Sequence, residues 1–239
     1  MKRIIIFCFA IFFAYILQAE TWVAVYAQFL NSPETSPGLS VEELKQAYSE
    51  QTNLQFAGYY KTIHTEKEYA FSADTSTKKN KFNISGSDAW YYDLVNKKSF
   101  RPGLDFSKGF DNLEPVIQES DYTQPEWIIE QDTQTINGFL CQKARVKVSP
   151  EEEATEPQIT AWFCKDIPYA TGPDGNWGLP GIIVNLEFRN SSLAFIYSFV
   201  LQSYYTLPDA NPIKIILPKC KRVGSDVFIL KQHTRTVNM

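Results

Sequence analysis

The sequence predicts a mainly β fold, a large curved antiparallel sheet or an open barrel or bowl, with one short N-terminal helix. From Leu54 onward, short runs rich in Tyr, Phe, Ile, Val and Thr are separated by Asn, Asp, Gly and Pro, which are strand and turn signals respectively. The helix is predicted at Val41–Glu50, where Ser40 is a suitable N-cap and Glu43 completes a capping box. No segment has the composition of a linker, so we expect residues 20–239 to form a single domain.

The candidate strands are rich in β-branched and aromatic residues and are bounded by turn formers. They are Tyr59–His64, Glu68–Asp74, Lys79–Ser85, Trp90–Asn96, Ser99–Pro102, Trp127–Ile136, Leu140–Val148, Gln158–Lys165, Ile182–Arg189, Ala194–Tyr205, Ile213–Leu217 and Val227–Arg235.

Residues 1–19 have the layout of a secretory signal peptide. Lys2 and Arg3 provide the positive start, an apolar run without charged side chains follows, and Ala19 is a suitable last residue before cleavage. A second cleavage position ends at Ala27. A spanning helix needs about 20 apolar residues, so the run is too short and no later stretch qualifies. We therefore expect an exported protein without a transmembrane segment in its mature chain.

The charge balance argues against nucleic acid as a partner. The formal net charge is −4, and it becomes about −6 when Lys2 and Arg3 are removed with the signal. The sequence has no basic stripe that could neutralise phosphates, so neither nucleic acid nor an anionic lipid surface is an expected partner.

One hairpin can be predicted in register. If Cys141 lies opposite Cys164 in an antiparallel pair, Ala144 lies opposite Ala161, and the face that carries Leu140 is expected to be buried. Directly opposed residues in such a pair approach closely enough for a bridge, so a Cys141–Cys164 disulfide is predicted.

Two alternatives to that disulfide stay open. The two cysteines are separate buried thiols, or Cys220 pairs with one of them. The cysteines have no histidine at ligand spacing, and no metal or other cofactor is predicted.

An ordered set of short motifs gives the chain its most specific signal. They are Asn137–Ala144 (NGFLCQKA), Ala161-Trp162-Phe163, Ile167-Pro168, Gly172-Pro173 and Gly178–Ile183 (GLPGII). The set resembles the GLPGLI family, with Ile182 where the family usually has Leu. The resemblance implies an exported envelope protein of a Gram-negative bacterium, in the periplasm or outer envelope, from a family without an established molecular function.

The chain is also similar to the bowl-like N-terminal domain beside one type of peptide-N-glycosidase. The glycosidase domain has no counterpart in this sequence, so that activity is not carried over. Cys164 departs from the family's usual residues after Ala-Trp, which makes the predicted disulfide a local feature.

The GLPGLI segment predicts a tight, irregular loop, because its glycines permit unusual backbone and its prolines fix φ. The signature residues are Gly172, Pro173, Gly178, Leu179, Pro180, Gly181, Ile182 and Ile183. Two interpretations stay open: a structural plug with Leu179 buried, or a lip that binds a ligand. Trp162, Trp177 and Leu179 are the candidate ligand-binding residues.

A catalytic centre is not predicted. His64 and His233 are the only histidines and neither lies in a recognisable motif. The leading interpretation is non-enzymatic binding of a hydrophobic ligand, a lipid, a peptide or an envelope-protein partner on a curved sheet. The alternative is a hydrolase of unrecognised type that uses carboxylates near the signature, for which Asp166, Asp174 and Glu187 are candidates.

Overall fold

The computed structural model describes residues 20–31, 55–74, 81–84, 89–105, 114–148, 158–190, 195–208 and 213–224. The described residues form fourteen strands. These are β1 (Glu20–Asn31), β2 (Gln55–His64), β3 (Glu68–Ala73), β4 (Lys81–Asn83), β5 (Trp90–Asp93), β6 (Lys98–Asp105), β7 (Glu114–Asp121), β8 (Trp127–Ile136), β9 (Phe139–Val146), β10 (Gln158–Cys164), β11 (Ile182–Asn190), β12 (Phe195–Pro208), β13 (Lys214–Ile216) and β14 (Lys221–Gly224).

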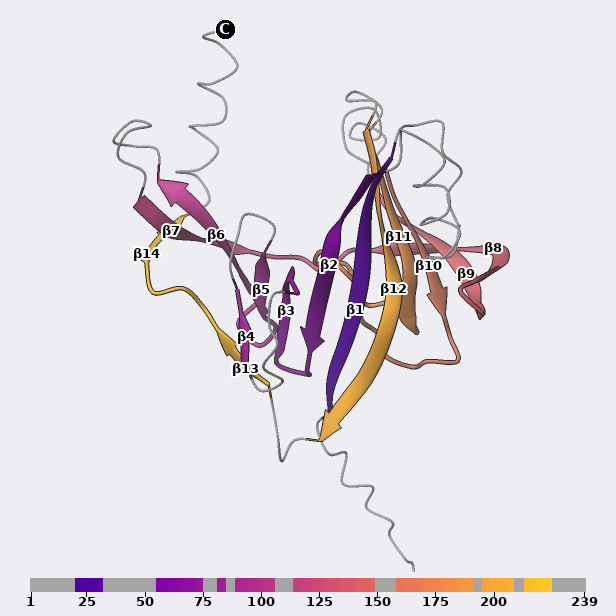
Figure 1. Ribbon diagram of the computed structural model, residues 1–239, viewed down its shortest axis with the longest axis horizontal. Coiled ribbons are helices and arrows are strands. Elements are labelled where there is room, and N and C mark those ends of the chain that lie inside the picture. Colours follow the sequence, from indigo (N-terminus) through magenta and orange to yellow (C-terminus); the bar gives the residue numbers. More distant parts are fainter. Residues whose placement is uncertain are drawn as a thin grey trace, which may run out of the picture.

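Twelve of these strands form one strongly bent sheet, and the other two form a small sheet of their own (Figure 1). The order in the large sheet is β14-β7-β6-β5-β3-β2-β1-β12-β11-β10-β9-β8. All its neighbours are antiparallel except β14, which pairs parallel to β7. The strands β14 and β8 stand at opposite ends, so the sheet is not closed into a barrel. The predicted β fold is confirmed, with a mixed rather than purely antiparallel sheet.

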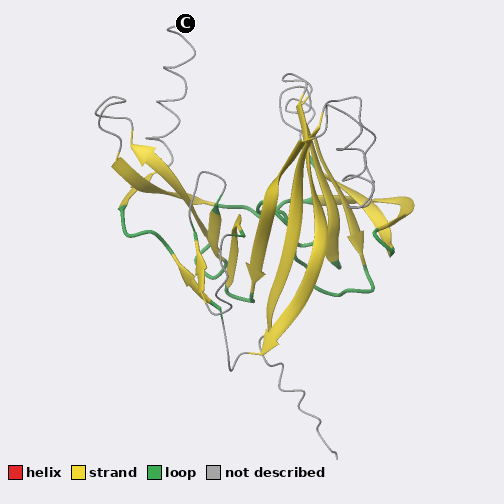
Figure 2. Ribbon diagram, viewed as in Figure 1, coloured by secondary structure: helices red, strands yellow, loops and turns green. Residues whose placement is uncertain are grey.

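The described part of the chain contains no helix (Figure 2). The helix predicted at Val41–Glu50 lies outside the described residues and so has no support from the structure. No helix among the residues that the structure describes is long and apolar enough to cross a membrane.

The strand predictions agree most closely with the structure at β8 and β11. Trp127–Ile136 is observed with the predicted bounds, and the predicted strand Val227–Arg235 lies outside the described residues. The strands β1, β7 and β14 were not predicted. Most of β1 is buried and reads as an apolar run next to the signal peptide, while β7 carries Pro115 and several acidic residues and β14 is short and exposed.

The hairpin formed by β9 and β10 has the predicted register, with Ala144 opposite Ala161. The predicted burial of one residue is wrong, because Leu140 is 62% exposed whereas Cys141 is buried. The register of β8 against β9 is irregular between Ile129 and Thr133, and β9 buries both Cys141 and Ala144. A simple alternation of faces therefore fails at this point.

Both faces of the sheet carry an apolar core. We call the face that carries Ala24 and Tyr26 of β1 the inner face, and it holds the larger core, which includes Phe71, Phe163 and Phe199. The outer face carries the smaller core. Its buried members are Val23, Ile63, Ala70, Phe82, Ile84, Ala89 and Ile213.

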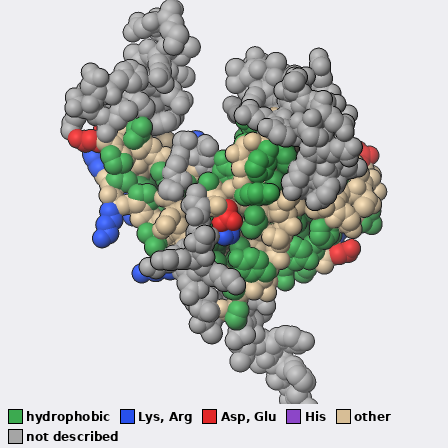
Figure 3. All heavy atoms as spheres, in the orientation of Figure 1, with side chains coloured by type: hydrophobic (Ala, Val, Ile, Leu, Met, Phe, Trp, Pro, Cys, Tyr) green, Lys and Arg blue, Asp and Glu red, His purple; other side chains and the backbone are tan. Residues whose placement is uncertain are grey.

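The outer core is covered by β4 and β13, which pair in parallel although they are far apart in the chain. The strand β4 leaves the large sheet between β3 and β5, which pair directly with each other. The cover is apolar: Phe82 of β4 is buried, and Ile215 of β13 packs partly buried beside it. In the view of Figure 3, several Lys and Arg side chains lie on the left side of the molecule, where Figure 1 draws β14 and β13.

Candidate functional site

The inner core is covered by the signature loop, residues 165–181, which connects β10 to β11. Ring hydroxyls and indole N–H groups from across the sheet bind it. The Tyr26 hydroxyl donates to the Ile183 carbonyl (3.0 Å), and the Tyr69 hydroxyl donates to the Gly172 carbonyl (2.7 Å). The Trp127 indole N–H donates to the Trp177 carbonyl (2.8 Å). The bonds from β3 and β8 fix the loop itself, and the bond from β1 fixes the start of β11 directly after the loop. All three strands are distant from the loop in sequence.

The tip of the loop is a tight turn with a sequence-level cause. Asp174 and Gly175 both have positive φ, 52° and 73°, and the Asn176 N–H donates to the Pro173 carbonyl (3.0 Å). Positive φ at both central residues is the geometry of a type I′ turn, for which Asp-Gly is a preferred pair. The Trp90 indole N–H donates to Asp174 Oδ1 (2.9 Å) and holds the turn from outside.

Two signature glycines are required for different reasons. A Cβ at Gly181 would collide with the backbone of Cys164, so this position requires close approach of two chain segments. Gly178 has a φ of 92°, and the side chain of Gln124 lies against it. The loop is thus shaped by backbone contacts that only glycine permits.

Most signature side chains are buried. Gly172, Pro173, Leu179, Gly181, Ile182 and Ile183 are buried, whereas Gly178 and Pro180 are exposed. Leu179 is 1% exposed and belongs to the inner core. The loop therefore fills the inner face as a plug does, with part of its edge open to solvent.

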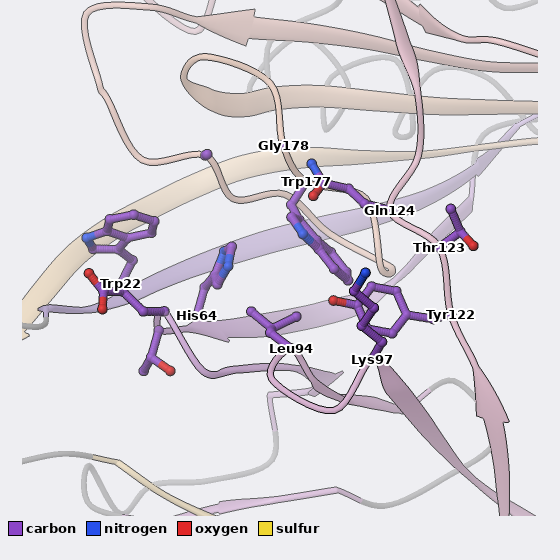
Figure 4. A pocket seen from close by; sticks show the side chains of 12 residues that line it. Trp22, His64, Leu94, Lys97, Tyr122, Thr123, Gln124, Trp177 and Gly178 are labelled. Carbon is purple, nitrogen blue, oxygen red and sulfur yellow. The ribbon is translucent and has the colours of Figure 1, made fainter.

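A cavity of about 660 Å³ lies beside that open edge (Figure 4). Its wall combines rings and an aliphatic side chain with a polar rim. The lining residues are Trp22, His64, Thr65, Glu66, Leu94, Lys97, Tyr122, Thr123, Gln124, Ala170, Trp177 and Gly178. They come from the start of β1, the β2–β3 and β5–β6 turns, the β7–β8 connection and the signature loop, which converge only in the folded chain.

Trp177 is the ring around which this site is built. It stacks on Tyr69 at 4.5 Å between ring centroids and meets Tyr92 and Tyr122 at 4.9 and 5.7 Å. Burial raises the pKa of the Tyr69 hydroxyl well above its ordinary value, so this group stays protonated and keeps its hydrogen bond to the loop. Because Trp177 is only 4% exposed, it forms a fixed wall of the cavity.

His64 is a wall residue that the sequence did not identify. It is 6% exposed and makes edge contacts with Trp22 (5.4 Å), Tyr69 (5.5 Å) and Trp177 (6.0 Å). Burial lowers the pKa of His64 to about 4, so the ring is neutral at neutral pH. A histidine at the end of a strand that contains several aromatic residues was the available signal. This signal does not distinguish a cavity-wall residue from an ordinary packing residue.

Trp22 was also missed, because it follows directly on the predicted signal peptide. It stacks on Tyr169 at 5.3 Å and lines the cavity from β1. Its indole nitrogen and His64 Nδ1 are buried and have no hydrogen-bond partner among the residues that the structure describes. The cavity wall therefore contains two polar atoms that the described chain leaves unsatisfied.

A family model described as a protein of unknown function, Porph_ging, matches residues 147–185, which include β10 and the signature loop. The segment carries the GLPGLI-family signature. The resemblance predicted from the motifs is thereby confirmed over this segment. The hexapeptide of this chain, Gly178–Ile183, contacts the backbone of Cys164 through Gly181 and lines the cavity through Gly178.

Solved structures give more distant likenesses. PNGF-II is 13% identical with a TM-score of 0.45, covering 90% of this chain and 33% of that protein. An uncharacterized conserved protein from Thermus thermophilus is 7% identical with a TM-score of 0.35, covering 87% of this chain and 91% of that one. A putative outer membrane lipoprotein-sorting protein domain from Vibrio parahaemolyticus is 9% identical with a TM-score of 0.28, covering 80% and 88%.

The chain spans about a third of the length of PNGF-II. No curated protein matches the chain.

The three candidate carboxylates do not line the cavity. Asp166 is exposed, and Asp174 accepts from Trp90 and from the Tyr197 hydroxyl (3.4 Å). Glu187 is buried on β11 and forms an ion pair with Arg189 (3.1 Å). Among the described residues, no group of His, Cys, Asp and Glu is arranged to hold a metal ion.

The three mature cysteines are free thiols in the structure. The observed register ends at Phe163 opposite Gln142, and its continuation by one residue would place Cys164 opposite Cys141. Both cysteines are buried in the inner core. Burial, with a contribution from Cys164, raises the pKa of the Cys141 thiol to about 12. The Cys141–Cys164 disulfide is not present and stays a prediction for the oxidised protein.

The other ligand-binding candidates lie elsewhere. Trp162 is partly buried against the inner core and is not part of the cavity wall, and Leu179 is inside the core. Of the three candidates, only Trp177 lines the cavity. His233 lies outside the described residues.

Proposed function

We propose that this chain is an exported, non-enzymatic binding protein that holds a hydrophobic ligand in the cavity beside the signature loop. The observation that carries the proposal is a cavity of about 660 Å³ whose wall includes Trp22, Leu94, Tyr122 and Trp177. That volume falls within the roughly 300–1,000 Å³ typical of small-molecule sites. Apolar walls with a few polar groups at the rim are typical of such sites as well.

The preformed wall supports binding without a large ordering cost. Trp177 is held by stacking on Tyr69 and by the hydrogen bond from Trp127 to its carbonyl. A ring that is already fixed loses little rotamer freedom when a ligand arrives, so more of the apolar contact appears as affinity.

The position of β1 favours cleavage after Ala19 over cleavage after Ala27. The strand covers Glu20–Asn31, so all of it follows Ala19. Cleavage after Ala27 would remove Trp22 from the cavity and Tyr26 from the inner core. A mature chain beginning at Glu20 keeps both, and the resemblance to GLPGLI proteins adds a Gram-negative envelope as its location.

A hydrolase has less support. Glu66 is the one carboxylate among the residues that line the cavity, and Asp174 and Glu187 are engaged in the contacts described above. Hydrolysis of glycosides needs two carboxyl groups that flank one bond.

Fluorescence titration of the chain from Glu20 with the apolar probe N-phenyl-1-naphthylamine tests the proposal. Leu94→Trp adds bulk in the middle of the wall and is expected to weaken binding at least about tenfold, the loss of roughly 1.4 kcal/mol of contact energy. Val95→Trp is the matched control, because the adjacent Val95 is 66% exposed and does not line the cavity. Non-saturable probe fluorescence, or equal loss in both variants, would overturn the proposal.

A further inference from the structure

A row of four aromatic rings leads away from the cavity along the inner face. Trp22 stacks on Tyr169 at 5.3 Å, Tyr169 meets Tyr204 at 6.2 Å, and Tyr204 meets Phe139 at 6.4 Å. We call these four residues the aromatic row. Because Trp22 also lines the cavity, the row and the cavity share one wall.

The row is accessible along its length. Trp22, Tyr169 and Phe139 are half-buried, and Tyr204 is 38% exposed. The register pairs Tyr204 with Ala24, a member of the inner core, so its ring lies on the same face as the signature loop. The apolar surface next to the cavity therefore continues from β1 across the loop and β12 to β9.

The backbone beneath the row argues against an extended peptide as the occupant. The strand β1 pairs with β2 on one side and β12 on the other, whereas β12 pairs with β11 only over Phe195–Val200. An added peptide strand needs free backbone groups at a sheet edge, and β1 offers none. A peptide paired to β12 beyond Val200 would run along that strand, whereas the row crosses from β1 over β12 to β9. A peptide laid over the rings would leave its own N–H and C=O groups unsatisfied.

The side chains of the row favour a hydrocarbon over a sugar chain. A sugar presents several hydroxyl groups for each ring, whereas the row itself offers two tyrosine hydroxyls and no charged group. An alkyl chain has no polar group to satisfy, and each methylene removed from water contributes about 0.8 kcal/mol.

We propose that the ligand is a long aliphatic chain, one part of which occupies the cavity while the rest lies along the aromatic row. This inference rests on the proposed function and adds the ligand's chemical class and minimum shape. A chain confined to the cavity touches Trp22 at most, and a longer chain reaches Tyr204.

Displacement of N-phenyl-1-naphthylamine by octanoate and by hexadecanoate tests the proposal. Tyr204→Ser is expected to weaken hexadecanoate about tenfold, since a few methylenes lose their contact surface, and to change octanoate less than about twofold. Tyr205→Ser is the matched control. Tyr205 is the adjacent residue at 41% exposure, and its register with Val23 of the outer core places it on the opposite face. It should affect neither acid.

Three results would overturn the inference. They are no effect of Tyr204→Ser on hexadecanoate, equal effects on both acids, and an equal effect of Tyr205→Ser. If probe binding still saturates and is still blocked by Leu94→Trp, the proposed function survives that failure. If the unsubstituted chain shows no saturable probe binding, both the proposed function and this inference are wrong.

Discussion

The two faces of the sheet are covered in contrasting ways. The inner core is covered by an irregular loop that side chains from several strands bind through hydrogen bonds, and that glycine allows to touch the backbone of Cys164. The outer core is covered by β4 and β13, two short strands whose contribution is apolar packing. The outer face therefore requires only apolar surface from its cover. The inner face requires a covering loop with one specific backbone conformation. The cavity lies beside the cover with the definite shape.

The largest expected effect comes from breaking that shape at Gly181. Gly181→Ala places a methyl group against the backbone of Cys164, which cannot move aside as a flexible side chain could. We expect a loss of roughly 3 kcal/mol or more in the free energy of unfolding, at the upper end for an overpacked core. Urea unfolding followed by tryptophan fluorescence measures this loss.

A substitution in the outer cover provides the comparison. Ile215→Ala removes half-buried apolar surface from β13 and is expected to cost only about 1 kcal/mol. It should leave probe binding unchanged, because Ile215 packs on the outer core and does not line the cavity. If Ile215→Ala cost as much as Gly181→Ala, the two covers would not differ in kind.

A smaller effect is expected from acid acting on the inner face through His64. Its folded-state pKa of about 4 lies below the ordinary value of 6.5, so the unfolded chain binds more protons between these values. Stability from this residue is complete above about pH 6.5 and is lost as the pH falls toward 4. The loss amounts to about 2 kcal/mol by pH 5.

The matched variant for this pH dependence is His64→Gln, which cannot titrate. Its free energy of unfolding should fall less steeply than that of the unsubstituted chain between pH 7 and pH 5. Parallel curves for the two proteins, measured by urea unfolding, would show that His64 is not protonated differently in the folded and unfolded states.

The fold could be predicted from the sequence wherever a strand shows its own signal. The β9–β10 register follows from alternation and was predicted, as Ala144 and Ala161 show. The strand β1 was not predicted, because it follows directly on the apolar run of the predicted signal peptide and has no turn signal that separates it from that run. Pairing of β4 with β13 could not be predicted, since it joins short segments with no local link between them.

The candidate site was predictable only in part. The loop and Trp177 follow from the local motif, but the rest of the wall includes Trp22, His64 and Leu94, which belong to separate elements. The sequence around each of these three residues indicates only an ordinary packing role. Their meeting point depends on the bend of the whole sheet, which no single segment encodes.

The most direct test of the central claim is the indole N–H spectrum of isotope-labelled protein titrated with N-phenyl-1-naphthylamine. All five tryptophans, Trp22, Trp90, Trp127, Trp162 and Trp177, lie within the described residues. We predict that the Trp22 and Trp177 signals shift with a saturating profile while that of Trp162, outside the cavity wall, stays in place. A shift of Trp162 with Trp22 and Trp177 unchanged, or no shift at all, would contradict the claim that the cavity beside the signature loop is the binding site.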